Sequence, residues 1–410
     1  PGPITDKLVF VSLAIAQQLF PIYSLTKITE NHNHTERRKN MGYVSYFLLR
    51  ASCFSVFVLV SSAAYQNPVC PFDYLFHTGD GFFDVGNAIR VQPEGPMLPA
   101  NNYPYGITDP GFPSGRWCDG LLDIDFGGAQ YGFPTITPSL IAKPSNYIAL
   151  NLATTGSPIL EHSFFELRGV QIPSYAAPLR KQFNGLREYL SSICSTPAEC
   201  TAIMRNSLFI SGDVEANDIG YALIQGKSIE EARTYVPFIT EAQISSFREL
   251  VRMGTRRITV PGNAPLGCVP YILTALRSNN TADYDDKGCL KKVNDLIKYK
   301  NQQLESGVNR LKEEFPNVLF SFGDIFGAFE TILQDSLSGP NKKISLKACC
   351  GIGGEYNFDS IRFCGTPGVP VCADPLQYLH WDGIRLTQNA QKRLNTILIA
   401  GSKVALNCTG

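Results

Sequence analysis

Five short apolar runs are the feature that most constrains how this chain folds. They lie at residues 74–78, 147–151, 208–211, 256–260 and 318–322. Short, mostly apolar runs are typical of strands buried on both faces, and such strands occur in parallel sheets covered by helices. We therefore predict a central parallel β-sheet.

Helical patterns separate the apolar runs. The clearest pattern forms one apolar helix face and is stopped by Pro316; its apolar positions are Val293, Leu296, Ile297, Leu304, Val308 and Leu311. A last helix is expected to begin after Thr387, a typical N-cap, and to end before Gly401. Strands alternating with helices predict an α/β fold with helices on both faces of the sheet.

The N-terminal part of the chain has the pattern of a leader. Residues 1–40 precede the first Met and are interpreted as an upstream extension without a fold. Residues 41–64 combine Arg50, an apolar stretch and small residues, which is typical of a signal peptide. The uncharged stretch 51–64 is shorter than the roughly 20 residues that span a bilayer, so no stable membrane anchor is expected. These features predict secretion, to the extracellular space or another secretory compartment such as the vacuole, of a single domain at 68–408.

Cysteine usage agrees with an oxidising compartment. The chain has 12 Cys, of which Cys53 lies in the leader. No C-x-x-C pair is combined with His at zinc spacing, so we expect disulfides and no metal or other cofactor. An odd number after the leader leaves one thiol free or paired with another chain. Asn279 and Asn407 begin glycosylation sequons, which agree with the same route.

Charge excludes one class of partner. Lys plus Arg is 36 and Asp plus Glu is 36, so the formal net charge is zero. A protein that binds nucleic acid through its phosphates needs a surplus of basic residues, which this chain lacks. A small-molecule partner is expected instead, and the sequence predicts no oligomeric state.

Polar, glycine-rich loops follow three of the predicted strands. They are 79–87 (GDGFFDVGN), 151–157 (NLATTGS) and 212–218 (GDVEAND), and a fourth segment, 381–387 (WDGIRLT), leads into the last helix. Each alone is compatible with ordinary turn chemistry. Because ligands of open α/β sheets bind beyond the carboxyl ends of the strands, the four together predict a site at that edge.

These loops make the chain similar to the plant GDSL esterase/lipases of the SGNH hydrolase superfamily. Further shared stretches are 115–120 (GRWCDG), 260–268 (VPGNAPLGC) and 347–351 (KACCG), and the resemblance runs from about Tyr74 to Ala400. It implies a three-layer α/β/α, flavodoxin-like sandwich around a parallel sheet. It also implies hydrolysis of carboxylic esters by a Ser, His and Asp arrangement with an oxyanion hole.

Three positions of the resemblance keep the expected residue. Gly156 matches the glycine of the oxyanion hole, Asn217 matches its asparagine, and Asp382 matches the carboxylate that orients the histidine. The resemblance therefore assigns these residues to the candidate site.

The two decisive positions depart from the family. Gly81 stands where the nucleophilic serine is expected, and Arg385 stands where the histidine is expected. Glu215 also replaces a usual glycine. Glycine has no attacking oxygen, and a guanidinium has five donors and no acceptor, so neither can perform the triad's chemistry. The resemblance thus indicates a divergent member whose ester hydrolysis is absent or vestigial.

Other side chains near the loops offer a base or a nucleophile. A structural role is the commoner one for a single His, for a Cys in a disulfide-rich chain and for an Asp in a turn. The side chains in question are His77, His162, His380, Cys118, Asp80, Asp84 and Asp382.

Three functions follow from this interpretation. In the first, a secreted protein binds a small carbonyl or anionic metabolite through Arg385 and the former oxyanion donors, although Arg385 could instead only pair with Asp382. In the second, the same cleft is a cyclase, lyase or isomerase of plant specialised metabolism. In the third, residual hydrolysis of an ester-like plant metabolite persists by activated water.

Overall fold

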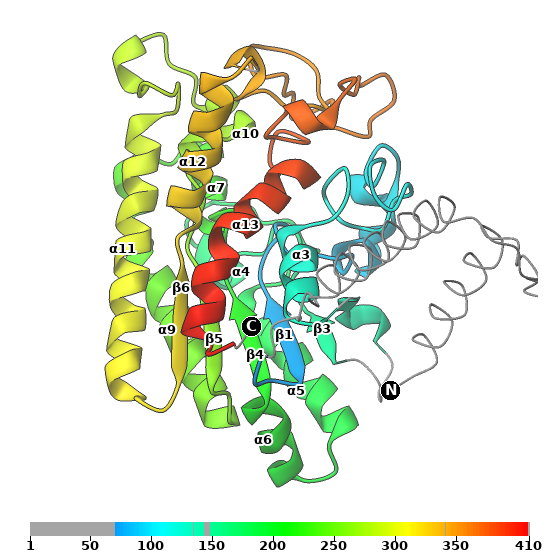
Figure 1. Cartoon of the computed structure of the whole chain (residues 1–410). Helices are drawn as coiled ribbons and strands as arrows, with labels where there is room; N and C mark the ends of the chain where they lie inside the picture. The colour runs from blue at the N-terminus through cyan, green and yellow to red at the C-terminus, as the bar shows by residue number, and fades with distance from the viewer. Residues whose placement is uncertain (1–69, 134, 143–147, 341, 409–410) are drawn as a thin grey trace, which may run out of the picture. The chain divides into compact units, whose positions relative to one another are not determined.

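The structure is a computed structural model that describes residues 70–408 apart from 134, 143–147 and 341. The predicted upstream extension and signal peptide therefore lie outside the described residues. A single sheet of six parallel strands organises the described chain, in the order β2-β3-β1-β4-β5-β6 (Figure 1). The strands are β1 Tyr74–Thr78, β2 Thr137–Pro138, β3 Ala149–Asn151, β4 Ser207–Ser211, β5 Arg257–Pro261 and β6 Leu319–Gly323.

The predicted strands are confirmed, with small differences at their ends. β4, β5 and β6 each begin or end one residue away from the predicted run, and the described part of the second run is strand from Ala149. β2 is a strand that the sequence did not predict. It has two residues, Thr137 and Pro138, and only its pairing with β3 makes it recognisable.

Helices cover both faces of the sheet, which confirms the three-layer sandwich (Figure 1). One face packs against α5 Leu179–Ile193, α9 Val236–Met253 and α11 Lys291–Glu314. The other face packs against α3 Asp123–Gln130, α12 Ile325–Ser338 and α13 Gln388–Ala405. The remaining helices are α4 His162–Glu166, α6 Pro197–Arg205, α7 Asn217–Ile224, α8 Ile229–Arg233 and α10 Pro270–Ala275. Each face of the sheet is therefore part of a separate apolar core.

The two helices predicted in detail differ in how well their ends were placed. α11 ends at Glu314, two residues before Pro316, because a proline disfavours helical geometry in the residue before it. Thr387 caps α13, accepting the N–H of Ala390. The prediction that α13 ends before Gly401 is wrong, since the helix continues to Ala405. One glycine inside a helix costs only about 1 kcal/mol, and burial of Leu406 just beyond the helix offsets that cost.

Five disulfides confirm the expected disulfide framework. They join Cys70 to Cys408, Cys194 to Cys200, Cys268 to Cys289, Cys349 to Cys372 and Cys350 to Cys364. Among the described cysteines, Cys118 is left as a buried free thiol. The first and last described segments of the chain are thus linked covalently.

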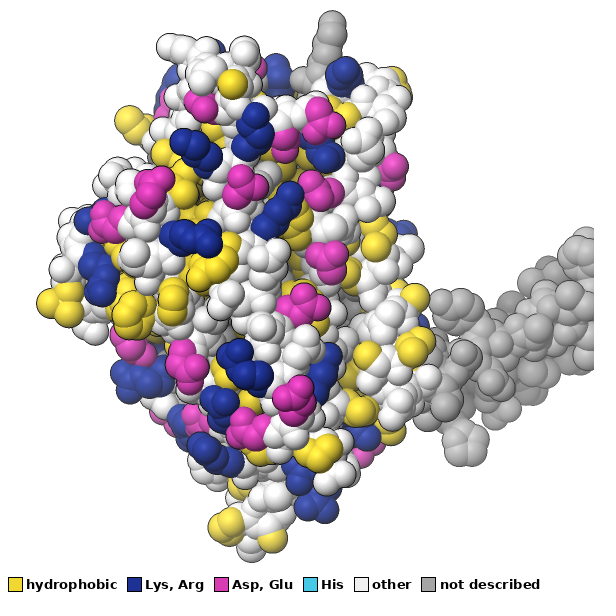
Figure 2. Space-filling view, turned by 90° about the vertical axis from the view of Figure 1, so that its left-hand side faces the viewer, with side chains coloured by type: hydrophobic (Ala, Val, Ile, Leu, Met, Phe, Trp, Pro, Cys, Tyr) yellow, Lys and Arg dark blue, Asp and Glu magenta, His cyan; other side chains and the backbone are white. Residues whose placement is uncertain are grey.

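The surface agrees with the balanced charge. On the face that carries α11, basic and acidic side chains are interspersed and do not gather into a patch of one sign (Figure 2). No helix between residues 70 and 408 combines the length and the apolarity needed to cross a bilayer.

Candidate functional site

The polar loops meet beyond the carboxyl ends of β1, β3 and β4, as the sequence predicted. Parallel pairing of β1 with both β3 and β4 brings the loops 79–87, 151–157 and 212–218 to one edge of the sheet. The segment 381–387 joins them there through Arg385, which contacts Thr155 and Glu215. All four segments therefore contribute to one cluster of buried polar side chains.

Arg385 lies at the centre of this cluster. Its side chain is 6% exposed, and its Nε donates to Glu215 Oε1 at 3.0 Å. One terminal nitrogen donates to Asp382 Oδ2 at 3.3 Å and the other to Thr155 Oγ1 at 2.6 Å. Burial alone would lower the pKa of Arg385, but the charges of Glu215 and Asp382 outweigh burial and raise it. The guanidinium is consequently a permanent cation held by two carboxylates.

An aromatic ring completes the environment of that cation. The guanidinium carbon of Arg385 lies 4.4 Å from the centroid of the Trp117 ring, within the range of a cation–π interaction. Trp117 belongs to the GRWCDG stretch, and the ring of Tyr105 packs edge-on against it. The sequence analysis included Trp117 in the resemblance but assigned neither residue to the site.

Gly81 faces the same cluster and has no free space beside it. A Cβ at this position would lie 2.8 Å from Arg385 Nε and from Glu215 Oε1, and closer still to Thr155 Oγ1. Such distances are shorter than real Cβ contacts. Gly81 is not in the left-handed region, so space and not backbone conformation demands glycine here. Sequence reasoning missed Thr155, because one hydroxyl in a polar loop carries no distinguishing signal.

Asp382 has both carboxylate oxygens occupied. Oδ1 accepts the backbone N–H groups of Ile384 and Arg385, at 2.9 and 2.8 Å. Oδ2 accepts the Tyr105 hydroxyl at 3.0 Å in addition to Arg385. Burial and the charge of Asp382 raise the pKa of Tyr105, which therefore acts as a neutral donor. Asp382 holds Arg385 where the resemblance places a histidine.

The two expected oxyanion donors both adjoin α7: Asn217 is its first residue, and Gly156 contacts Tyr221 of the same helix. The Asn217 side-chain amide donates to the carbonyl of Ser157 at 3.1 Å and to Glu215 Oε2 at 3.4 Å. Gly156 is left-handed, at φ +70°, and its carbonyl accepts the Tyr221 hydroxyl at 2.8 Å. Glu215 therefore already offers a carboxylate oxygen to the donor that an oxyanion would use.

Carboxylates outnumber the cation in this cluster. Asp80 Oδ2 accepts the backbone N–H of Glu215 at 2.8 Å; Asp80 is fully buried, and the side chain of Glu215 is 6% exposed. Burial raises the pKa of Asp80, and the neighbouring charges of Glu215 and Asp213 raise it further. Burial also raises the pKa of Glu215, against the opposing effect of Arg385. An additional anion would meet these carboxylates as well as the guanidinium.

Two further candidates from the sequence have structural roles. Asp84 uses both oxygens to accept backbone N–H groups, those of Gly86, Asn87, Ala88 and Thr155. Burial raises the pKa of the Cys118 thiol, and the negative charge of Asp119 raises it further, so the reactive thiolate is disfavoured. Neither side chain is placed to act as a base or nucleophile.

The histidines are equally unsuited to the role of base. His77 and His380 are fully buried, and their ring nitrogens have no hydrogen-bond partner among the described residues. Burial lowers the pKa of each to about 3. His162 lies elsewhere, with Nε2 at 2.9 Å from the carbonyl of Ala176. In the described part of the chain, no three His, Cys, Asp or Glu side chains are grouped to hold a metal ion.

Comparisons with known proteins agree with the resemblance. The model of the family described as GDSL-like Lipase/Acylhydrolase matches residues 75–397. Acetylajmalan esterase of Rauvolfia serpentina is 42% identical over 356 residues, which cover 86% of this chain and 92% of that protein. A GDSL esterase/lipase of Arabidopsis thaliana is 35% identical over 347 residues, covering 84% and 86%. A phospholipase A1 structure from Streptomyces albidoflavus NA297 superposes at a TM-score of 0.33 and 11% identity, covering 70% of this chain and 91% of that one.

Proposed function

This chain belongs to the GDSL lipase/acylhydrolase family, whose activity is the hydrolysis of carboxylic esters, and from that premise we propose that it is a secreted member that no longer hydrolyses esters and retains a small-molecule-binding role. Five disulfides in the described part support passage through an oxidising compartment.

One observation carries the loss of hydrolysis. The space into which a side chain at Gly81 would project is filled by Thr155, Glu215 and Arg385. The site therefore lacks the attacking hydroxyl, and its own side chains close the place where that hydroxyl would act. In serine hydrolases, loss of the nucleophile or of the base alone reduces turnover by a factor on the order of 10⁶.

The contacts of Arg385 favour a structural role for it over anion capture. The guanidinium already pairs with Glu215 and Asp382, and the void beside it, lined also by His380, has a volume of about 30 Å³. A site of that size holds a water molecule or two. A neutral carbonyl compound is a better ligand here than an anion, because it adds no charge next to the carboxylates, and it requires the cluster to open.

A non-hydrolytic enzyme is the second candidate. Its support is Glu215, a buried carboxyl with a raised pKa that lies between the donor groups of Asn217 and Arg385. Such a group is suited to proton transfer in a cyclase, lyase or isomerase. A cyclising or eliminating activity that a Glu215→Gln variant loses, while it folds normally, would distinguish this candidate from binding alone.

Restoring the missing groups tests the main proposal. The unmodified protein should not react with a fluorophosphonate probe and should not hydrolyse p-nitrophenyl acetate. Gly81→Ser with Arg385→His should restore little, because Glu215 still occupies the space of the new side chain, whereas the Thr155 hydroxyl loses its Arg385 donor in this variant and can rotate away. Adding Glu215→Gly should restore labelling and measurable hydrolysis.

A matched variant controls for the hydroxyl. Gly81→Ala in place of Gly81→Ser, combined with Glu215→Gly and Arg385→His, reproduces the space without an attacking oxygen and should stay inactive. The proposal fails if the unmodified protein hydrolyses the ester as fast as the triple variant with serine.

A further inference from the structure

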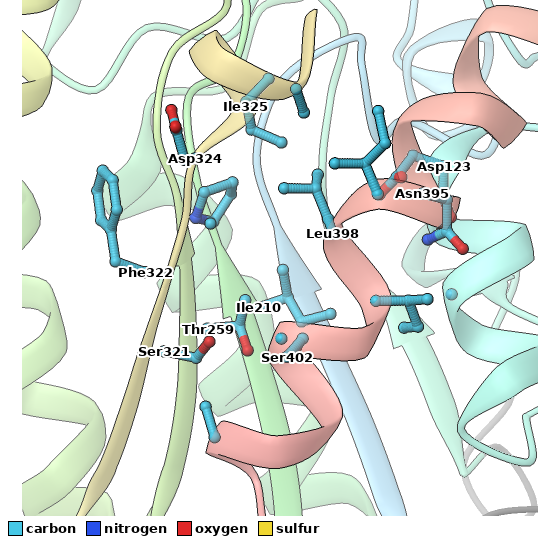
Figure 3. Close-up of a pocket in the computed structure, with 18 of the residues that line it drawn as sticks. Asp123, Ile210, Thr259, Ser321, Phe322, Asp324, Ile325, Asn395, Leu398 and Ser402 are labelled. Carbon is cyan, nitrogen blue, oxygen red and sulfur yellow. Dashed lines mark hydrogen bonds between the residues drawn. The ribbon is translucent and has the colours of Figure 1, made fainter. Parts of the chain in front are cut away.

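A second, larger cavity lies away from the Arg385 cluster. It has a volume of about 800 Å³ and is bounded by the sheet on one side and by α13 on the other, with α3 and α12 at its ends (Figure 3). None of the candidate site residues Gly81, Gly156, Asn217, Asp382 and Arg385 lines it. We call it the α13 cavity, and its function is independent of the function proposed above.

The floor of the α13 cavity is a row of side chains across three strands. Ile210 of β4 is the register partner of Thr259 of β5, and Thr259 is the partner of Ser321 of β6. Register partners in a sheet point to the same face. Thr259 and Ser321 have short side chains. They leave space between the sheet and α13 that larger apolar side chains would fill.

The helix above the floor also leaves space. Gly401 of α13 lines the cavity, and a Cβ at this position would have no atom within 4 Å. Ser402 and Ala405, on the same helix, are small as well. Small residues on both sides of the gap explain why sheet and helix do not close it.

The lining offers an apolar surface and unsatisfied polar atoms. Apolar side chains include Phe83, Ile325 and Leu398. Two oxygens of the lining, Asp123 Oδ1 and Thr259 Oγ1, are buried without a hydrogen-bond partner among the described residues. Leaving a buried polar atom without a hydrogen bond costs about 1–3 kcal/mol. A ligand that donates a hydrogen bond to one of these oxygens removes that cost, which favours binding.

The charged side chains that line the cavity determine which charge a bound ligand should carry. Three carboxyl groups line the cavity, those of Asp123, Glu305 and Asp324, against one ammonium, that of Lys312. Figure 3 shows Asp123 beside Asn395, apart from the floor residues Thr259 and Ser321. The acidic surplus favours a cation, and the apolar walls favour a hydrocarbon body.

We propose that the α13 cavity binds a small apolar amine in its protonated form. The ammonium group donates to Asp123, and the hydrocarbon part lies over the strand floor beneath α13. Burial raises the pKa of Asp123 to about 7; a hydrogen bond with Asn395 opposes this shift and the charge of Asp125 adds to it, so the carboxylate that pairs with the amine is formed above neutral pH. Binding of the cation should therefore strengthen from pH 6 to pH 8.

Three probes that share a naphthylmethyl group and differ in charge test the proposal. They are 1-naphthylmethylamine, which is a cation at pH 8, 1-naphthylmethanol, which is neutral, and the carboxylate of 1-naphthaleneacetic acid, which is an anion. Binding of each probe to the full protein is measured by equilibrium dialysis at pH 8. The cation should bind about tenfold more tightly than the neutral probe, as a charge-assisted hydrogen bond predicts, and the anion most weakly. Equal binding of all three probes, or tightest binding of the anion, would overturn the proposal.

Matched variants locate the binding. Asp123→Asn should reduce the affinity for the cation to that for the neutral probe, whereas Asp295→Asn, at an exposed position of α11, should change nothing. Gly401→Phe should abolish binding of both probes, whereas Ala400→Phe, on the exposed neighbour outside the lining, should preserve it. Binding that survives Gly401→Phe in a folded protein places the probe elsewhere and refutes the assignment.

Discussion

At the scale of single residues, the members of the Arg385 cluster explain one another. Gly81 has no side chain, and the atoms that take its space belong to Thr155, Glu215 and Arg385. Glu215 and Asp382 together neutralise Arg385, which would otherwise be a buried unpaired charge. A serine at Gly81 alone should therefore clash, and a histidine at Arg385 alone should leave the Glu215 carboxylate without its cation.

Titration of His380 gives a test at the same scale. Its ring is fully buried, and burial lowers its pKa to about 3. Between pH 3 and 6.5 the unfolded chain binds a proton here that the folded protein does not, so His380 makes the free energy of unfolding rise with pH. The slope for one proton is at most about 1.4 kcal/mol per pH unit.

His380→Phe removes this dependence, and urea unfolding measures it. From pH 4 to pH 6, the stability of the unmodified protein minus that of the variant should rise by about 1.4 kcal/mol per pH unit, and it should level off above pH 7. His77 titrates in both proteins and cancels. A difference that stays constant with pH would mean that the folded protein protonates His380 normally.

At the scale of elements, local sequence placed strands and helix starts better than helix ends. The apolar runs located five strands, and the hydroxyl of Thr387 located the start of α13. Gly401 was misread because glycine commonly follows a helix, whereas here it lies inside one. Whether a helix continues through a glycine depends on what its next turn packs against, and that contact is tertiary.

Gly401→Ala tests the corrected end of α13. An alanine Cβ would meet no atom within 4 Å, and alanine is about 1 kcal/mol more favourable than glycine in a helix interior. The variant should therefore be more stable by up to about 1 kcal/mol in urea unfolding. Loss of stability would indicate that α13 ends before residue 401.

At the scale of the whole molecule, one disulfide closes the described chain. Cys70 precedes β1, Cys408 follows α13, and the two are 338 residues apart. Cross-linking a long loop stabilises the folded state mainly by restricting the unfolded chain, and the effect grows slowly with loop length.

Removing this link should lower stability markedly. Cys70→Ser with Cys408→Ser should cost about 2–5 kcal/mol, seen as a lower melting temperature under non-reducing conditions. Cys194→Ser with Cys200→Ser serves as the control, because that pair is 6 residues apart and should cost less. Equal losses would argue against an effect of loop length.

The sequence by itself determined the parallel α/β sandwich and the loops that meet at one edge of the sheet, and it predicts that Gly81 and Arg385 stand where the resemblance places a serine and a histidine. Each of these depends on local composition or on residues close together in the chain. Only the tertiary structure decided that the edge is closed, because Arg385 meets Glu215 and Thr155 across 170 and 230 residues. Such contacts depend on strand order and register, which an apolar run predicts only in part. The α13 cavity could not be predicted from the sequence for the same reason, because its floor is assembled from three strands.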